Sequence, residues 1–236
     1  MDQYDTVRQP PLFFISYAHD SGEDDKHVQR FYQDLDHDVS MFAARRNTSA
    51  GFCDVAFELG ERWSPSLINN LSTAQVFIPI LSPVYFASQG CGREWAVFAS
   101  RLARSRAPDT TSSLIPLLWV PMELPPIAQP YQYRETAFGT VYEEVKLRSL
   151  IREGRHVDHY QSFVQRLAQR IVDRCRSTKV AEAEDRPGFD DVESAFAPVP
   201  HHIGAEARGG SAGPPAAARA LDSRPILNPF LPSEES

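Results

Sequence analysis

Glu94 is the residue whose type and surroundings point most directly to chemistry. A helix through this segment would bury Cys91 and Trp95 on one face, and Glu94 would lie about 60° to one side of Cys91. A carboxylate at the edge of a buried face is partly desolvated but can still project into a cleft, where its charge acts more strongly. The alternative is an ordinary surface glutamate that pairs with Arg93 or Arg101.

The other groups of reactive side chains are weaker candidates. His156 and His159 could contact one metal ion, but no third ligand is evident, so no metal site is predicted. Residues 209–213 match the string of a nucleophile elbow but lack the strand and helix that would expose the serine. Cys91 has no nearby histidine and is predicted to be a packing thiol. The sequence has no glycine-rich phosphate loop of a standard spacing.

The elements that must position Glu94 alternate between strand-like and helical patterns, which is typical of a parallel sheet with helices on both faces. Short apolar runs predict strands at residues 12–17, 51–56, 75–81 and 113–120. Apolar stripes at spacings of three and four predict the helices, and residues 141–150 fit a weak strand or a helix. We therefore expect an α/β fold, a doubly wound five-stranded parallel sheet of the flavodoxin-like type, with its fifth strand unplaced.

Polar residues follow these strands at the carboxyl edge, where parallel sheets bind their ligands. Tyr17 and Asp20 come after the first strand, and Ser82 follows the third. Ser82 precedes a proline, a pair that also predicts a helix start. We predict that these three side chains form the wall of a site beside Glu94.

Composition excludes several classes of partner. The chain has 236 residues and a net charge of -7, and it lacks an apolar run near the roughly 18 residues that a membrane-spanning helix needs. It has no basic stripe, so neither nucleic acid nor a membrane is expected as a partner. The three cysteines are far apart and odd in number, and the start is polar. We expect reduced thiols in a cytoplasmic protein.

The sequence divides into three predicted regions. Residues 1–10 form an N-terminal extension, and residues 11–176 form the folded domain. Residues 177–236 are rich in alanine, proline and glycine and carry most of the chain's net negative charge. Their apolar side chains are too scattered to offset the entropy of ordering, so we expect a disordered acidic tail.

The folded domain resembles a TIR domain in the phrases FFISYAHD, ELGERW, VFIPILSPVYFAS and CGREW, which occur in the family's order. The phrases ELGERWSP and CGREWA also resemble bacterial TIR-like proteins of the FxsC type. Those proteins are encoded beside FxSxx-COOH peptide precursors and radical-SAM maturases. The resemblance therefore implies a bacterial protein linked to peptide maturation.

The family resemblance implies a signalling or scaffold function. Some TIR domains associate with one another or with partner proteins through the loop after the second strand. The corresponding loop here would make this chain a homo-oligomer on activation, with an interaction surface formed by Glu58, Gly60, Glu61, Arg62 and Trp63.

The alternative implied by the family is an NAD nucleosidase (NADase), which hydrolyses the bond between nicotinamide and ribose. In such enzymes a glutamate of the third helix is essential, and its counterpart by motif is Glu94. NAD would be a substrate, and no cofactor is required. Many TIR domains have an aromatic residue where this chain has Gly90, and Trp95 or Trp63 is a candidate to replace that aromatic wall.

Overall fold

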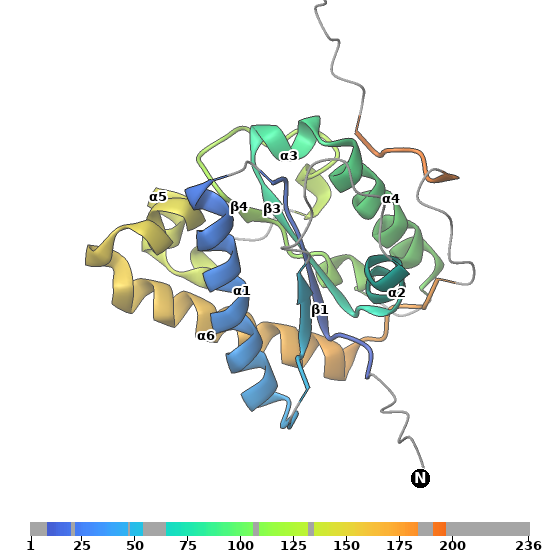
Figure 1. The fold of residues 1–236 in the computed structure, drawn as a ribbon, viewed down its shortest axis with the longest axis horizontal. Coiled ribbons are helices and arrows are strands. Elements are labelled where there is room, and N and C mark those ends of the chain that lie inside the picture. Colours follow the sequence, from blue (N-terminus) through green and yellow to red (C-terminus); the bar gives the residue numbers. More distant parts are fainter. Residues whose placement is uncertain are drawn as a thin grey trace, which may run out of the picture. The chain divides into compact units, whose positions relative to one another are not determined.

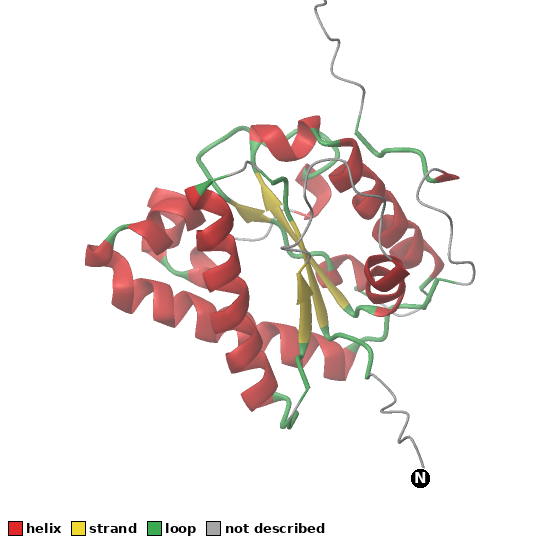
Figure 2. Cartoon of the chain, in the orientation of Figure 1, coloured by secondary structure: helices red, strands yellow, loops and turns green. Residues whose placement is uncertain are grey.

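The computed structural model describes residues 9–19, 22–46, 48–53, 65–105, 109–131, 135–183 and 191–196. Within this part, a parallel sheet lies between two groups of helices (Figure 1). The α/β class and the helical cover on both faces are therefore confirmed, and Figure 2 shows the strands enclosed by helices.

The sheet has four strands in the part of the chain that the structure describes, with the order β2-β1-β3-β4, and every neighbouring pair is parallel. The strands are β1 (Phe13–Ser16), β2 (Gly51–Cys53), β3 (Val76–Leu81) and β4 (Leu117–Leu118). All residues of β1 and β3 are buried. This burial on both faces explains why the two central strands have continuous apolar runs rather than alternating ones.

The prediction of five strands is wrong for the described residues, where only four are present. The segment considered for the fifth strand is the helix α5 (Thr140–Arg152). This segment is therefore the helix of the two alternatives. Its buried residues Leu147, Leu150 and Ile151 follow spacings of three and four, which fit a helix and not a strand. The helix is kinked at Lys146, whose φ is 61° and ψ is 175°.

Six α-helices lie in the described part of the chain. They are α1 (Glu23–Phe42), α2 (Pro65–Thr73), α3 (Pro83–Ala87), α4 (Gln89–Arg104), α5 and α6 (Val157–Ser177), with short 3-10 turns at Thr110–Ser113, Gln129–Tyr131, Glu135–Phe138 and Gly154–His156. Ser82 caps α3 by accepting a hydrogen bond from the Tyr85 amide at 3.1 Å, as its position before a proline predicts. Ser88 caps α4 in the same way. None of the described helices is both long and apolar enough to span a membrane.

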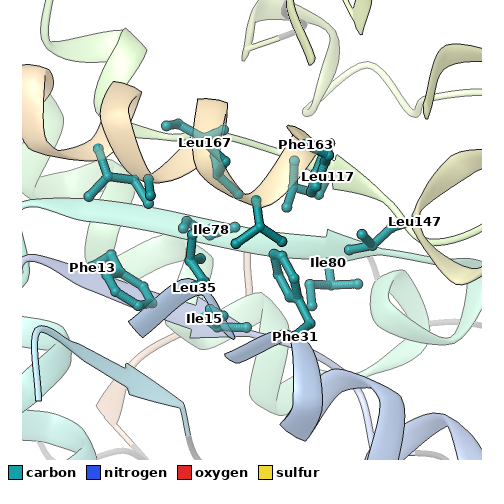
Figure 3. Packing of buried hydrophobic residues seen from close by; sticks show 14 of the residues in the cluster. Phe13, Ile15, Phe31, Leu35, Ile78, Ile80, Leu117, Leu147, Phe163 and Leu167 are labelled. Atoms are coloured by element: carbon teal, nitrogen blue, oxygen red, sulfur yellow. The ribbon is translucent and has the colours of Figure 1, made fainter. Parts of the chain in front are cut away.

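Each face of the sheet is covered by its own hydrophobic core. The first core joins one face to α1, α5 and α6, and Phe31 and Leu35 meet Phe163 and Leu167 over the strands (Figure 3). The second core joins the other face to α2, α3 and α4. Side chains of β1 alternate between the two cores, as expected for a strand.

Two segments beyond residue 176 pack on the second core, although the sequence predicts a disordered tail from residue 177. Val180 and Phe196 are both buried. The Arg101 guanidinium donates a hydrogen bond to the Ala181 carbonyl at 2.9 Å, and the Ala195 amide donates one to the Gly92 carbonyl. The tail prediction is therefore wrong for residues 177–183, of which Ser177 ends α6, and for residues 191–196. The remainder of the predicted tail lies outside the described residues.

Candidate functional site

Glu94 lies in the second turn of α4, where the helix passes the carboxyl end of β1. Its side chain is half-buried, and its carboxylate accepts a hydrogen bond from the hydroxyl of Ser16, the last residue of β1. Ser16 itself is buried, with 1% of its surface exposed. The predicted position of Glu94 at the edge of a buried helical face is therefore what the structure shows.

Tyr85 of α3 extends this contact into the second core. The Tyr85 hydroxyl lies 2.9 Å from the Ser16 hydroxyl, and the tyrosine is fully buried. A serine hydroxyl has only one proton, and Ser16 donates that proton to Glu94. Tyr85 must therefore be the donor to Ser16. The result is a directed chain of hydrogen bonds, Tyr85 to Ser16 to Glu94, that fixes the orientation of the carboxylate.

The groups beside Glu94 stay protonated. Burial, together with the negative charge of Glu94, raises the pKa of Tyr85 well above 10.0. Burial and then the Glu94 charge also raise the pKa of Cys91 far above its ordinary value. A thiol that holds its proton is a poor nucleophile. Cys91 therefore packs in the core, as predicted, and Tyr85 remains a hydrogen-bond donor.

Tyr17 and Ser82 lie at the same edge of the sheet but line a separate pocket. This pocket has a volume of about 240 Å³, and its lining includes Tyr17, Asp24, Ser82, Trp119 and Arg148 but not Glu94. The reason is strand geometry, because successive side chains point to opposite faces. Ser16 points toward α4, and Tyr17 belongs to the core on the α1 side. The structure therefore does not bring Tyr17 and Ser82 together with Glu94 in one wall.

Trp95 is a core residue in this structure. Only 1% of its surface is exposed, and its ring contacts Phe77, Tyr131 and Phe196 at centroid distances of 6.4, 5.6 and 5.9 Å. A ring enclosed on these sides cannot stack on a ligand without a rearrangement of the core. Its predicted role as an aromatic wall is not supported by this packing.

The remaining predicted site residues, Asp20, Glu58, Gly60, Glu61, Arg62 and Trp63, lie outside the described residues. Their roles stay predictions.

His156 and His159, the weak candidates for a metal site, have ring centroids 6.3 Å apart. The described residues contain no group of three or more side chains able to hold a metal ion.

Ser16 and Tyr85, the two hydroxyl residues that orient Glu94, were not predicted from the sequence. The signal for Ser16 was available, because strand alternation places it on the opposite face from Tyr17. The signal for Tyr85 was weaker, since a buried tyrosine in a five-residue helix has no helical stripe to mark it. The contact of Tyr85 with Ser16 could be recognised only from the packing of α3 against the end of β1.

Fold and site together define a doubly wound α/β domain with an oriented carboxylate at the carboxyl edge of its sheet. Residues 13–151 match the family of the TIR domain, and this match covers more than half of the chain. The chain therefore belongs to the TIR domain family. A comparison with curated proteins gives no significant match.

Proposed function

We propose that the chain is a signalling or scaffold module that acts by self-association or by binding a protein partner. The observation that supports this proposal is the TIR family membership of residues 13–151. The predicted interaction loop joins the end of β2 to the start of α2. The strand β2 that precedes it in the sequence is an edge strand of the described sheet.

The test of this proposal replaces Arg62 and Trp63 together with alanine. We expect weaker self-association in sedimentation velocity and weaker partner recovery in pull-down experiments, because both side chains would be lost from the contact. Arg46→Ala, a change of an exposed arginine on the described surface, is the control and should leave both measurements unchanged. If the loop variant and the control behave alike in both assays, the association loop is somewhere else.

We propose NAD cleavage at the nicotinamide–ribose bond as a second function, supported by the hydrogen bond that orients Glu94. Nicotinamide leaves as a neutral molecule with the electron pair of the broken C–N bond, so no general acid is needed. The carboxylate would bind the ribose hydroxyls and stabilise the positive charge that develops on the ribosyl carbon. Water then adds to that carbon and releases a proton, which completes the hydrolysis to nicotinamide and ADP-ribose.

Ser16 and Tyr85 support this role because their hydrogen bonds orient the carboxylate before substrate arrives. A group held in position does not reorganise as charge develops, and such preorganisation is a large part of electrostatic catalysis. Most glycosidases need two carboxylates, but a leaving group that requires no proton makes one sufficient.

The test incubates concentrated protein with NAD and measures nicotinamide by chromatography. We expect Glu94→Gln to abolish release, since the charge that stabilises the ribosyl centre is removed. Glu144→Gln changes an exposed glutamate of α5 in the same way and should keep full activity. Equal release by wild-type protein and Glu94→Gln, or none by either at concentrations that support assembly, argues against this function.

We also propose a bacterial, cytoplasmic role beside an FxSxx-COOH peptide-maturation system. This proposal rests only on the phrases ELGERWSP and CGREWA. Deletion of the gene should lower the yield of mature peptide in the host, and restoration of the chain should recover it. An unchanged yield of mature peptide would reject the link.

A further inference from the structure

The segment 191–196 is anchored on α4 outside the part of the chain that matches the TIR family. Phe196 is 7% exposed. Its ring lies 5.6 Å from that of Tyr85, 5.1 Å from that of Phe86 and 5.9 Å from that of Trp95, all between centroids. These three rings form an aromatic socket, and Phe196 fills it.

The backbone of α4 is shaped to accept this segment. The Ala195 amide donates a hydrogen bond to the Gly92 carbonyl at 3.0 Å. A Cβ atom at Gly92 would lie only 2.0 Å from the Ser194 hydroxyl oxygen and 3.0 Å from the Phe196 ring. A side chain at position 92 would therefore force the Ser194 hydroxyl away from the Phe196 amide, to which it is hydrogen-bonded, and would crowd the Phe196 ring. Glycine avoids both, although it costs about 1 kcal/mol relative to alanine in a helix interior.

The socket connects the segment to the candidate site. Tyr85 contacts Phe196 with its ring and Ser16 with its hydroxyl, and Ser16 donates to the Glu94 carboxylate. Phe196 does not need to touch the carboxylate to affect it. If the Tyr85 ring shifts, the hydroxyl that orients Ser16 shifts with it.

We infer that Phe196 is a positioning residue for the Glu94 carboxylate and acts through Tyr85 and Ser16. The segment 191–196 thus completes a site whose other described members lie in the TIR domain. This inference deepens the proposed NAD-cleaving function and rests on it for its catalytic consequence. The coupling between Phe196 and Glu94 is a structural property that can be measured without NAD.

The first experiment is a double-mutant cycle on thermal unfolding of the full chain. Residues that do not touch are expected to give additive shifts in melting temperature unless something couples them. We expect Phe196→Ala and Glu94→Gln to be non-additive, because the first change already releases the Tyr85–Ser16 contact. Phe196→Ala with Glu144→Gln is the matched control and should be additive. Additive shifts in both pairs would overturn the inference.

The second experiment separates positioning from simple loss of packing. If the wild-type protein releases nicotinamide, we expect Phe196→Ala to lower kcat about tenfold to a hundredfold with little change in KM, since misplacement of a catalytic group affects mainly the transition state. Phe196→Leu keeps an apolar side chain in the socket and should restore most of kcat. A rise in KM alone, or no rescue by leucine, would contradict a positioning role.

A third pair of variants covers the case in which Phe196→Ala does not fold. Gly92→Ala should displace the segment while every socket residue is retained, and Gly90→Ala is its control, because a Cβ there meets only the Ser88 hydroxyl at 3.7 Å. We expect at least tenfold faster hydrogen exchange of the Ala195 amide in Gly92→Ala and no change in Gly90→Ala. Non-additivity should then appear between Gly92→Ala and Glu94→Gln. Absence of NAD cleavage would remove the second proposed function, but these exchange and unfolding measurements would still decide the coupling.

Discussion

At the scale of single residues, Asp24 connects three elements beside the pocket. It lies in the first turn of α1 and accepts hydrogen bonds from Arg148 of α5 at 2.8 Å and from the Trp119 indole, which follows β4, at 3.1 Å. Burial would raise the pKa of Asp24, but the hydrogen bonds from Arg148 and Trp119 and the positive charge of Arg148 together hold it below 3.8. The ionised form is therefore stabilised by folding.

We predict that Asp24→Asn lowers the free energy of unfolding by about 1.5–3 kcal/mol at neutral pH, as is typical of hydrogen bonds to charged groups. Because the pKa of Asp24 is lower in the folded state, its contribution is present above pH 3.8 and is lost as the pH falls through the lowered value. Urea unfolding across this pH range should therefore show a difference between wild type and Asp24→Asn that shrinks in acid.

The control for this prediction is Asp173→Asn, which changes an exposed aspartate on α6. It should alter the unfolding free energy by a few tenths of a kcal/mol at most. A difference between wild type and Asp24→Asn that stays constant from neutral to acid pH would mean that the ion pair with Arg148 contributes nothing to stability.

The candidate site was predictable from sequence in part. Helical periodicity was enough to place Glu94 at the edge of a buried face. The grouping of Tyr17 with Glu94 failed because both were assigned to one rim without regard to strand parity, and neighbours in a strand point to opposite faces. The role of Tyr85 depends on the packing of α3 against β1, which no local pattern encodes.

At the scale of elements, the packing of the edge strand β2 against β1 depends on Gly51. Gly51 of β2 pairs with Phe13 of β1, and a Cβ atom at Gly51 would lie 2.1 Å from the tip of the Phe13 ring. The ring occupies the space that any larger side chain would need. It is fully buried in the first core, so it has little room to move aside.

We predict that Gly51→Ala lowers the free energy of unfolding by about 1–3 kcal/mol, the usual cost of forcing extra volume into a packed core. Chemical denaturation followed by circular dichroism measures the change. Gly154→Ala is the matched control, since a Cβ there meets nothing within 4 Å, and it should be neutral or slightly stabilising. Equal stabilities of the two variants would show that the Phe13 ring can relocate at no cost.

The elements themselves were predictable where the pattern was long or strongly apolar. The apolar runs that form β1 and β3 were evident in the sequence because both strands are buried on two faces. The segment 141–150 was ambiguous because its apolar residues follow no single period, and α5 has a kink at Lys146 that interrupts the helical one. Val180 and Phe196 gave no signal, since their apolar neighbours are mostly alanines and neither segment is long enough to show a helical or strand period.

At the scale of the whole described domain, the family segment and the folding unit differ. The TIR match ends at residue 151, whereas α6 (Val157–Ser177) packs against α1 and α5 and buries Phe163 and Leu167 in the first core. A chain without α6 would expose this face of the core to water. The described residues that pack on the domain continue to Phe196, which is buried in the second core.

We predict that a chain ending at residue 151 fails to fold cooperatively, because the loss of a buried aromatic or aliphatic side chain typically costs about 2–5 kcal/mol and α6 contributes several. A chain ending at residue 199 should keep the melting temperature of the full chain within a few degrees. Differential scanning calorimetry distinguishes the two. A cooperative transition in the shorter chain would mean that α6 is dispensable for the domain.

The absence of a side chain at position 92 has an evolutionary consequence. We expect relatives that carry an aromatic residue equivalent to Phe196 to keep glycine at the equivalent of Gly92, because a Cβ there crowds the segment, and we expect relatives without such a segment to vary at that position. The two positions should therefore change together among descendants of a common ancestor. A lineage that gains alanine or serine at the first should lose the aromatic residue at the second.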